Sequence, residues 1–154
     1  MKSVLISIKP NWCELIASGK KTVEVRKTKP KLETPFKVYI YETNWKDNTY
    51  WKNHHKGRLG KVIGEFMCDN IGESGWFLTP DHPMWKDAYD EESCLTDREM
   101  YEYSKGGTFY LWHISELVIY DKPRELGEFS KYGYGHIVPL KMPFQSWGYV
   151  EVSE

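Results

Sequence analysis

The chain has 154 residues, of which 40% are hydrophobic and 28% are charged, and its formal net charge at pH 7 is -1. This length suits one domain with a single packed core. The balanced charge excludes an overall field that attracts nucleic acid, so any nucleic-acid binding must come from a local patch.

The start of the chain predicts two strands separated by a short helix. Apolar residues at 4–8 favour a mostly buried first strand. Pro10 is typical of the first position of a helix, and Gly19 is typical of the residue that follows a helix end. A second strand is predicted at 22–26, and prolines then mark a loop.

The middle of the chain predicts two further strands. These lie at 37–42 and 60–68, and Gly64 inside the second indicates a bulge or a close backbone approach. Residues 44–60 are polar and predict an excursion with no regular element. Residues 72–90 are expected to be irregular as well.

The last third begins with a helix-start signal. Thr96 and Glu99 match the capping box, which predicts a helix through about Tyr103. Residues 108–120 predict a long strand with a break near Ser115 and Glu116, residues 123–134 a loop or short helix, and residues 146–152 a closing strand.

Together these elements predict an α+β, mainly β fold. Strands outnumber helices and do not alternate with them regularly, which disfavours a parallel βαβ sheet. We expect a small, partly open β-barrel with short helices at its ends, and a single domain over residues 1–154.

Aromatic residues are unusually frequent. Seven tryptophans and eleven tyrosines exceed what one core of this size needs, so several rings should be exposed and able to stack on bases.

The three cysteines have no paired or zinc-type spacing, so we expect no metal, no cofactor and no disulfide. No signal peptide or membrane span is predicted, and we expect a cytoplasmic protein without a membrane partner.

The densest group of chemically active side chains lies at residues 18–27, where four cations and one carboxylate span the predicted helix end and the strand that follows. Alternate side chains of a strand share a face, so Val23 and Val25 can face a core. The opposite face carries a hydroxyl, a carboxylate and a guanidinium, with two lysines at its entrance: Thr22, Glu24, Arg26, Lys20 and Lys21. Such a face can bind a phosphate or polarise a carbonyl while a carboxylate moves protons. The alternative is a solvated strand face with an ordinary ion pair.

The sequence GKKTVEVR at 19–26 resembles the G-x-K-x-x-E-x-R signature of the ASCH domain family, within the PUA-like superfamily. It follows a strand that ends in Lys9 and a short helix that carries Trp12, and the resemblance covers most of residues 1–120. Residues 131–154 look like a subfamily-specific C-terminal extension. The resemblance implies a PUA-like β-barrel with a cleft beside the signature strand. It also implies RNA, a nucleotide or a modified nucleoside as ligand.

Enzymatic activity is a second implication of the resemblance. Some small members of the family are amidohydrolases that act on acetylated cytidine, and others are ribonucleases. The amidohydrolases use a lysine that matches Lys21, a threonine whose position falls at Glu24, and an acid that corresponds to Glu91 or Glu92. The replacement at Glu24 argues against that deacetylation and leaves hydrolysis open, because a carboxylate can activate water.

The candidate catalytic residues are therefore Lys21 and Glu24. The candidate ligand-binding residues are cations and aromatics near the cleft or in a glycine-rich loop: Lys9, Trp12, Lys20, Arg26, Tyr134 and His136. Each has a structural alternative, such as a core position for Trp12, pairing with Glu24 for Arg26 and a structural loop histidine for His136.

Three functions remain open from the sequence. The cation cluster and the aromatic excess favour a module that binds RNA or a nucleotide. A small hydrolase that uses Lys21 and Glu24 is the first alternative. A protein-interaction module with an aromatic docking surface is the second, and its partner is unknown.

Overall fold

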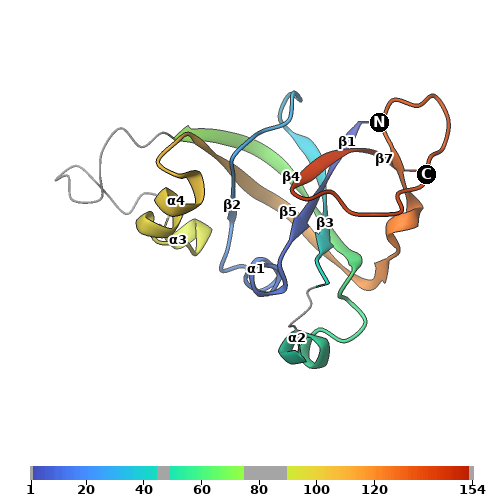
Figure 1. Ribbon diagram of the computed structural model, residues 1–154, viewed down its shortest axis with the longest axis horizontal. Helices are drawn as coiled ribbons and strands as arrows, with labels where there is room; N and C mark the ends of the chain where they lie inside the picture. The colour runs from blue at the N-terminus through green and yellow to red at the C-terminus, as the bar shows by residue number, and fades with distance from the viewer. Residues whose placement is uncertain (1, 45–48, 75–89, 153–154) are drawn as a thin grey trace.

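The computed structural model describes residues 2–44, 49–74 and 90–152 (Figure 1). Within them one sheet has seven strands: β1 (Ser3–Ile8), β2 (Val23–Arg26), β3 (Phe36–Glu42), β4 (Lys61–Ser74), β5 (Phe109–Arg124), β6 (Phe129–Lys131) and β7 (Trp147–Val152). The helical segments are α1 (Pro10–Ala17), α2 (Thr49–His54), α3 (Asp90–Ser93), α4 (Asp97–Ser104) and the 3-10 turn η1 (Leu126–Glu128).

The strand order is β2-β5-β4-β3-β1-β7-β6. The β1–β3 pair is parallel and the other strand pairs are antiparallel, so the sheet is mixed. The mainly β prediction is confirmed. Among the described strands, β2 pairs with β5 alone and β6 with β7 alone, which leaves an open sheet. Closure into a barrel is therefore not confirmed.

The first strand is buried along its whole length because both faces of the sheet are covered. Val4, Ile6 and Ile8 pack in the largest apolar cluster, with residues of β3, β4 and α1. Leu5 packs in a second cluster with Phe129. The mostly apolar stretch at 4–8 thus marks the centre of the core.

Two irregularities bend the long β4–β5 pair. A Cβ atom at Gly64 would lie 2.4 Å from the carbonyl oxygen of Val118, and the register of the pair shifts at that point. Glu116 has a φ of 49°, and the register shifts again beside it. Such bulges bend a strand and increase its twist. Both sites agree with the sequence prediction.

Helix ends follow the sequence signals closely. Pro10 is the first residue of α1, and Gly19 follows that helix with a φ of 81°. At the start of α4, the Thr96 hydroxyl accepts a hydrogen bond from the Glu99 N–H at 3.1 Å. The Glu99 carboxylate accepts one from the Thr96 N–H at 3.2 Å, which completes the capping box.

Two regions depart from the prediction. Helix α2 lies within 44–60, where the sequence predicts no regular element. Helix α2 has no buried residue, so its sequence lacks the helical spacing of apolar residues that would have predicted it. Its C-terminal flank is held through the buried Glu42, which lies 2.5 Å from His55 Nδ1 and accepts a hydrogen bond from Arg58 at 2.9 Å. Strand β4 continues to Ser74, and residues 75–89 of the stretch predicted to be irregular lie outside the described residues.

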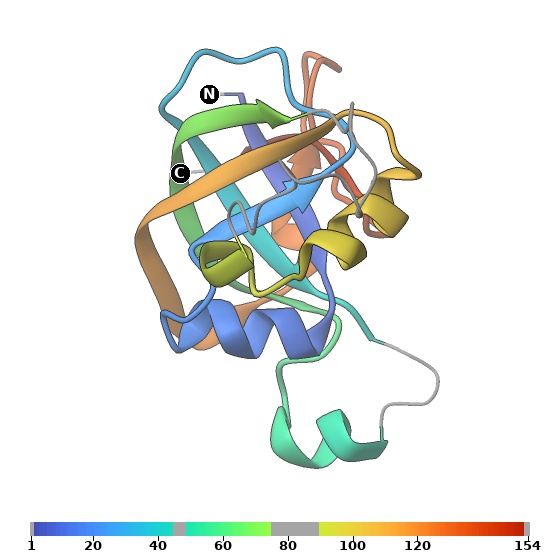
Figure 2. The same cartoon turned by 90° about the vertical axis from the view of Figure 1, so that its left-hand side faces the viewer.

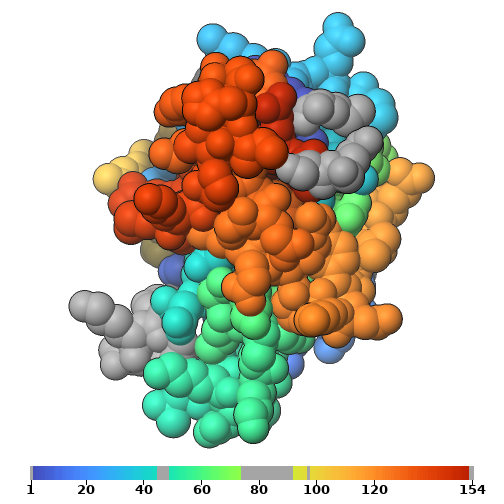
Figure 3. Space-filling view, turned by 90° about the vertical axis from the view of Figure 1, so that its right-hand side faces the viewer, coloured from blue at the N-terminus to red at the C-terminus, as the bar shows by residue number. Residues whose placement is uncertain are grey.

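The C-terminal segment completes the sheet and the core. Strand β7 pairs with β1 on one side and β6 on the other. Leu140 and Val150 are buried in the same cluster as Leu5. In the space-filling view, atoms from residues 120–145 form much of one face (Figure 3). This C-terminal segment is therefore a structural part of the fold.

Candidate functional site

The signature strand β2 is an edge strand that carries an apolar and a polar face. Val23 and Val25 pack with Met100 of α4 and with Phe109 and Leu111 of β5. Helices α3 and α4 lie beside this strand (Figure 2). The predicted alternation is confirmed. The solvated face of the alternative is wrong, because the exposed fractions of Lys21 and Glu24 are only 2% and 5%. Its same-face ion pair is present, between Glu24 and Arg26 at 2.7 Å.

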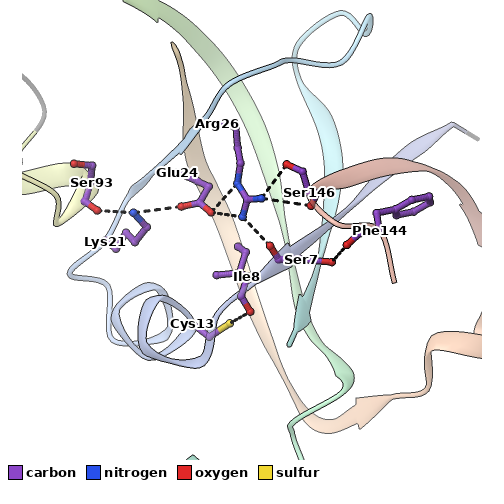
Figure 4. Close-up of polar contacts among 9 residues, drawn as sticks. All are labelled: Ser7, Ile8, Cys13, Lys21, Glu24, Arg26, Ser93, Phe144 and Ser146. Atoms are coloured by element: carbon purple, nitrogen blue, oxygen red, sulfur yellow. Dashed lines mark hydrogen bonds and ion pairs between the residues drawn. The ribbon is translucent and has the colours of Figure 1, made fainter. Parts of the chain in front are cut away.

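Glu24 lies between two cations. Its Oε1 atom lies 3.3 Å from Lys21 Nζ. Its Oε2 atom accepts hydrogen bonds from Arg26 at 2.7 Å through Nη2 and at 3.2 Å through Nε (Figure 4). Both carboxylate oxygens are therefore engaged, and the three side chains form one array in which Lys21 and Glu24 are buried and Arg26 is partly buried.

Lys21 reaches this array from the turn after α1. The Lys21 N–H donates to the carbonyl oxygen of Leu15 at 3.0 Å, and the Thr22 N–H donates to that of Glu92 at 2.7 Å. Lys21 Nζ donates to the carbonyl oxygen of Ser93 at 2.5 Å and lies 5.0 Å from the centre of the Trp12 ring. The ammonium is thus held by a carbonyl, a carboxylate and an aromatic face.

Arg26 ties β2 to two remote segments. Its Nη2 atom donates to the carbonyl oxygen of Ser7 at 2.7 Å, and its Nη1 atom donates to the Ser146 hydroxyl at 3.1 Å. The Ser7 hydroxyl in turn donates to the carbonyl oxygen of Phe144 at 2.6 Å. Because the N–H groups of this guanidinium already donate to such partners, Arg26 orders the chain around it and has few N–H donors left for a phosphate.

Electrostatics keep the Glu24 carboxyl ionised. Burial by itself would raise the pKa of this group, but Arg26 and Lys21 outweigh burial and lower the pKa below its usual value. At neutral pH the Glu24 carboxyl is therefore ionised. An ionised carboxylate with a low pKa is a weak general base, since such catalysis works best with a pKa near the working pH.

The array forms one wall of a cleft of about 860 Å³. Five of the eight sequence candidates line it, namely Lys9, Trp12, Lys21, Glu24 and Arg26. Further lining comes from β1, the end of β3, α4 and the segment before β7, with Ser7, Thr43, Asn44, Leu95, Glu99, Glu102, Tyr103, Gln145 and Ser146. A volume of this size falls within the range of small-molecule sites, roughly 300–1,000 Å³.

The other three candidates lie outside this lining. Lys20 is exposed, and its carbonyl oxygen accepts a contact from the Cys94 thiol at 3.5 Å. Tyr134 and His136 are exposed in the 132–137 segment, where their rings lie 6.4 Å apart. Glu92 is exposed, while nothing is described for the side chain of Glu91.

Sequence reasoning missed the serines of the site. Ser7 and Ser93 act through their backbone carbonyls, which every residue has, so no side-chain pattern could have identified them. Ser146 contributes a hydroxyl, but 120 residues separate it from Arg26.

In the described ranges no three His, Cys, Asp or Glu side chains gather into a possible metal site. None of the described helices is both long and apolar enough to span a bilayer.

Comparisons with known proteins agree on one fold. The family model for the ASCH domain matches residues 6–119. The structure is similar to that of an ASCH protein from Zymomonas mobilis, with a TM-score of 0.61 at 21% identity over 97% of this chain and 87% of that one. A Ser→Ala variant of the Zymomonas protein gives a TM-score of 0.64 at 20% identity, covering 97% of this chain and 88% of the variant. A Tyr→Phe variant of the same Zymomonas protein gives a TM-score of 0.60 at 19% identity, covering 98% of this chain and 91% of the variant. Among curated proteins there is no match.

Proposed function

The chain belongs to the ASCH domain family, and from that premise we propose that it binds RNA or a nucleotide by holding a single nucleoside unit in the cleft beside β2. The observation that carries this proposal is the cleft lining, which combines the Trp12 and Tyr103 rings with the largely buried Lys21–Glu24–Arg26 array. Aromatic rings supply stacking faces for a base, and buried polar groups fix its orientation.

The charge of the cleft favours one nucleoside unit over a run of phosphates. Its lining residues include three cations, Lys9, Lys21 and Arg26, and three carboxylates, Glu24, Glu99 and Glu102. This balanced lining contrasts with the signature segment at 18–27 itself, which has four cations and one carboxylate. A balanced wall attracts a polyanion weakly, whereas the donors and acceptors of a base edge need no net charge.

Several lining groups suit the edge of a base. Glu99 and Glu102 of α4 are exposed carboxylates that accept hydrogen bonds, and Gln145 is an exposed amide that both donates and accepts. They line the same cleft as Trp12 and the Lys21–Glu24–Arg26 array. A base stacked on Trp12 would thus have polar partners on the α4 side.

The test is calorimetric titration with cytidine, acetylated cytidine and a short single-stranded RNA. We expect saturable binding that weakens about tenfold in Trp12→Leu, because stacking of one base is worth roughly 1–3 kcal/mol. Gln145→Ala, at an exposed lining position, should weaken binding with no effect on folding. Lys20→Ala is the matched control, since Lys20 lies outside the lining, and it should bind as the wild type does. No saturable heat from the folded protein at millimolar ligand would overturn the proposal.

A hydrolase is the second candidate, and one observation favours it. Lys21 Nζ and Glu24 Oε1 lie 3.3 Å apart within the cleft lining, so an ammonium and a carboxylate adjoin the same bound ligand. Turnover would require Glu24 to exchange one of its cations for a water. Product analysis of the same titration mixtures decides the question. New product that disappears in a folded Glu24→Gln variant would favour the hydrolase, and equal rates in both proteins would exclude a role for Glu24.

A further inference from the structure

The lysines of the loop between β2 and β3 lie beside tyrosines that come from other parts of the chain. This loop crosses the upper edge of the molecule, with α4 on one side and the start of β1 on the other (Figure 1). We call this surface the lysine–tyrosine band, and it consists of Lys2, Lys27, Lys29, Lys31, Tyr103, Tyr110, Tyr132 and Tyr149.

Each end of the band is defined by contacts. Lys27 Nζ lies 4.9 Å from the centre of the Tyr103 ring, and Lys29 Nζ lies 5.4 Å from that of Tyr110. At the other end, Lys2 Nζ lies 4.0 Å from the Tyr149 ring and 4.7 Å from the Tyr132 ring. The ammonium groups of Lys2, Lys27 and Lys29 are therefore each held next to an aromatic face.

Strand β7 anchors the loop that carries these lysines. Trp147 Nε1 donates to the Thr28 hydroxyl at 2.9 Å, and the Lys31 N–H donates to the Tyr149 hydroxyl at 2.8 Å. The ammonium groups of Lys27, Lys29 and Lys31 remain on exposed side chains. The band is thus a preformed surface, which lowers the ordering cost of binding.

The band carries the local positive charge that the cleft does not. Between residues 27 and 35 the chain has three lysines and one glutamate, against a net charge of -1 for the whole chain. Lysines interleaved with tyrosines match single-stranded nucleic acid, because the cations pair with phosphates and the rings stack with unpaired bases. Lys29 also borders a second cavity of about 480 Å³, which adds room beside the loop.

Tyr103 joins the band to the cleft. Its ring lines the cleft and also lies beneath the Lys27 ammonium. We propose that the lysine–tyrosine band binds the single-stranded RNA that flanks the nucleoside unit held in the cleft. This inference rests on the proposed function for its choice of ligand, but it concerns a separate surface, so the two can fail independently.

The experiment compares oligomers with a single nucleoside. Fluorescence anisotropy measures binding of labelled oligouridylates of 2, 4, 8 and 12 nucleotides at several salt concentrations, and calorimetry measures cytidine. We expect affinity to rise with length up to about 4–8 nucleotides and to fall with salt. In the triple variant Lys27→Ser, Lys29→Ser and Lys31→Ser, the slope of log K against log salt should decrease by about 2, at about 0.7 per phosphate contact on a single strand. Cytidine binding should be unchanged.

A control variant removes the same charge elsewhere. Lys52→Ser, Lys56→Ser and Lys122→Ser alters three exposed lysines outside the band and should keep the wild-type slope. Tyr132→Ala tests stacking and should weaken the longer oligomers about tenfold. Equal salt slopes in the two triple variants would overturn the proposal that the band binds RNA. Competition by polyglutamate as effective as that by RNA would also overturn it. Length-dependent binding through the band without cytidine binding would support the band and overturn the cleft proposal. No binding of any ligand would overturn both.

Discussion

Lys21 Nζ lies 2.5 Å from the carbonyl oxygen of Ser93, 72 residues further along the chain, and so joins the signature strand region to α3. The same ammonium contacts Glu24, which in turn contacts Arg26. One lysine therefore lines the cleft and also closes a contact between distant segments. Loss of ligand binding on substitution of Lys21 is informative only when folding is measured in the same variant.

Substituting Lys21→Met should destabilise the protein by about 3 kcal/mol, because removal of one partner from a buried ion pair leaves uncompensated charge. The Ser93 carbonyl would lose its donor in the same variant. Urea unfolding followed by tryptophan fluorescence measures the change. The neighbouring Lys20→Met is the matched control at an exposed position, where changes are usually within about 0.5 kcal/mol. Equal changes in the free energy of unfolding for the two substitutions would contradict a stabilising role for the buried Lys21 contacts.

Glu24 should make the protein sensitive to acid. Its pKa in the folded state is lowered from 4.5 because Arg26 and Lys21 outweigh the effect of burial. Just below pH 4.5 the unfolded chain binds more protons than the folded one, so stability rises with pH in that window. The contribution is complete above about pH 5 and is lost progressively as pH falls from 4.5 through the lower folded pKa.

Unfolding curves collected between pH 3 and pH 7 test this sign. Glu24→Gln should be less stable at pH 7 and show a shallower fall towards pH 3 than the wild type. The fall should persist in part, since Lys37 and Tyr120 also lower the pKa of Glu65 against the opposing effect of burial. Asp121→Asn, at an exposed carboxylate, should retain the wild-type profile. If the stability of Glu24→Gln falls with pH in parallel with that of the wild type, Glu24 is not a source of the acid sensitivity.

Local rules predicted local features of this molecule. The period of a strand separated Val25 from Glu24 and Arg26, and the capping box located the start of α4. The burial of Glu24 was beyond such rules, because it depends on Trp112 opposite it on β5 and on helices that arrive some 70 residues later. The balanced charge of the cleft was also hidden, since Glu99 and Glu102 belong to a helix distant in sequence from the signature.

Gly64 should tolerate no side chain. A Cβ atom there would lie 2.4 Å from the Val118 carbonyl oxygen, and that oxygen belongs to the backbone of the paired strand. Gly64→Ala must therefore shift β4 against β5, at a cost of about 1–3 kcal/mol. Gly72→Ala, in the same strand, meets the Leu111 side chain at an ordinary 3.6 Å and should cost much less. Thermal unfolding of the two variants distinguishes them, and equal midpoints would contradict the close approach.

His55 should hold the α2 segment against the rest of the molecule. Its ring is 4% exposed and lies 2.5 Å from the fully buried carboxylate of Glu42, which immediately precedes the cleft residue Thr43. His55→Ala leaves Glu42 with Arg58 as its remaining partner and should destabilise the region by about 1–3 kcal/mol. Limited trypsin digestion should then cut faster at the exposed Lys52 and Lys56.

The adjacent histidine provides the control for this anchor. His54 is exposed and stacks on Tyr50 within the same helix, at 3.7 Å between ring centres. His54→Ala removes an imidazole from α2 without touching Glu42, so trypsin should cut that variant at nearly the wild-type rate. Faster cutting in both variants would mean that α2 is held by its own stacking. Faster cutting in His55→Ala alone, together with weaker nucleoside binding, would show that the buried Glu42 contact also orders the wall of the cleft at Thr43.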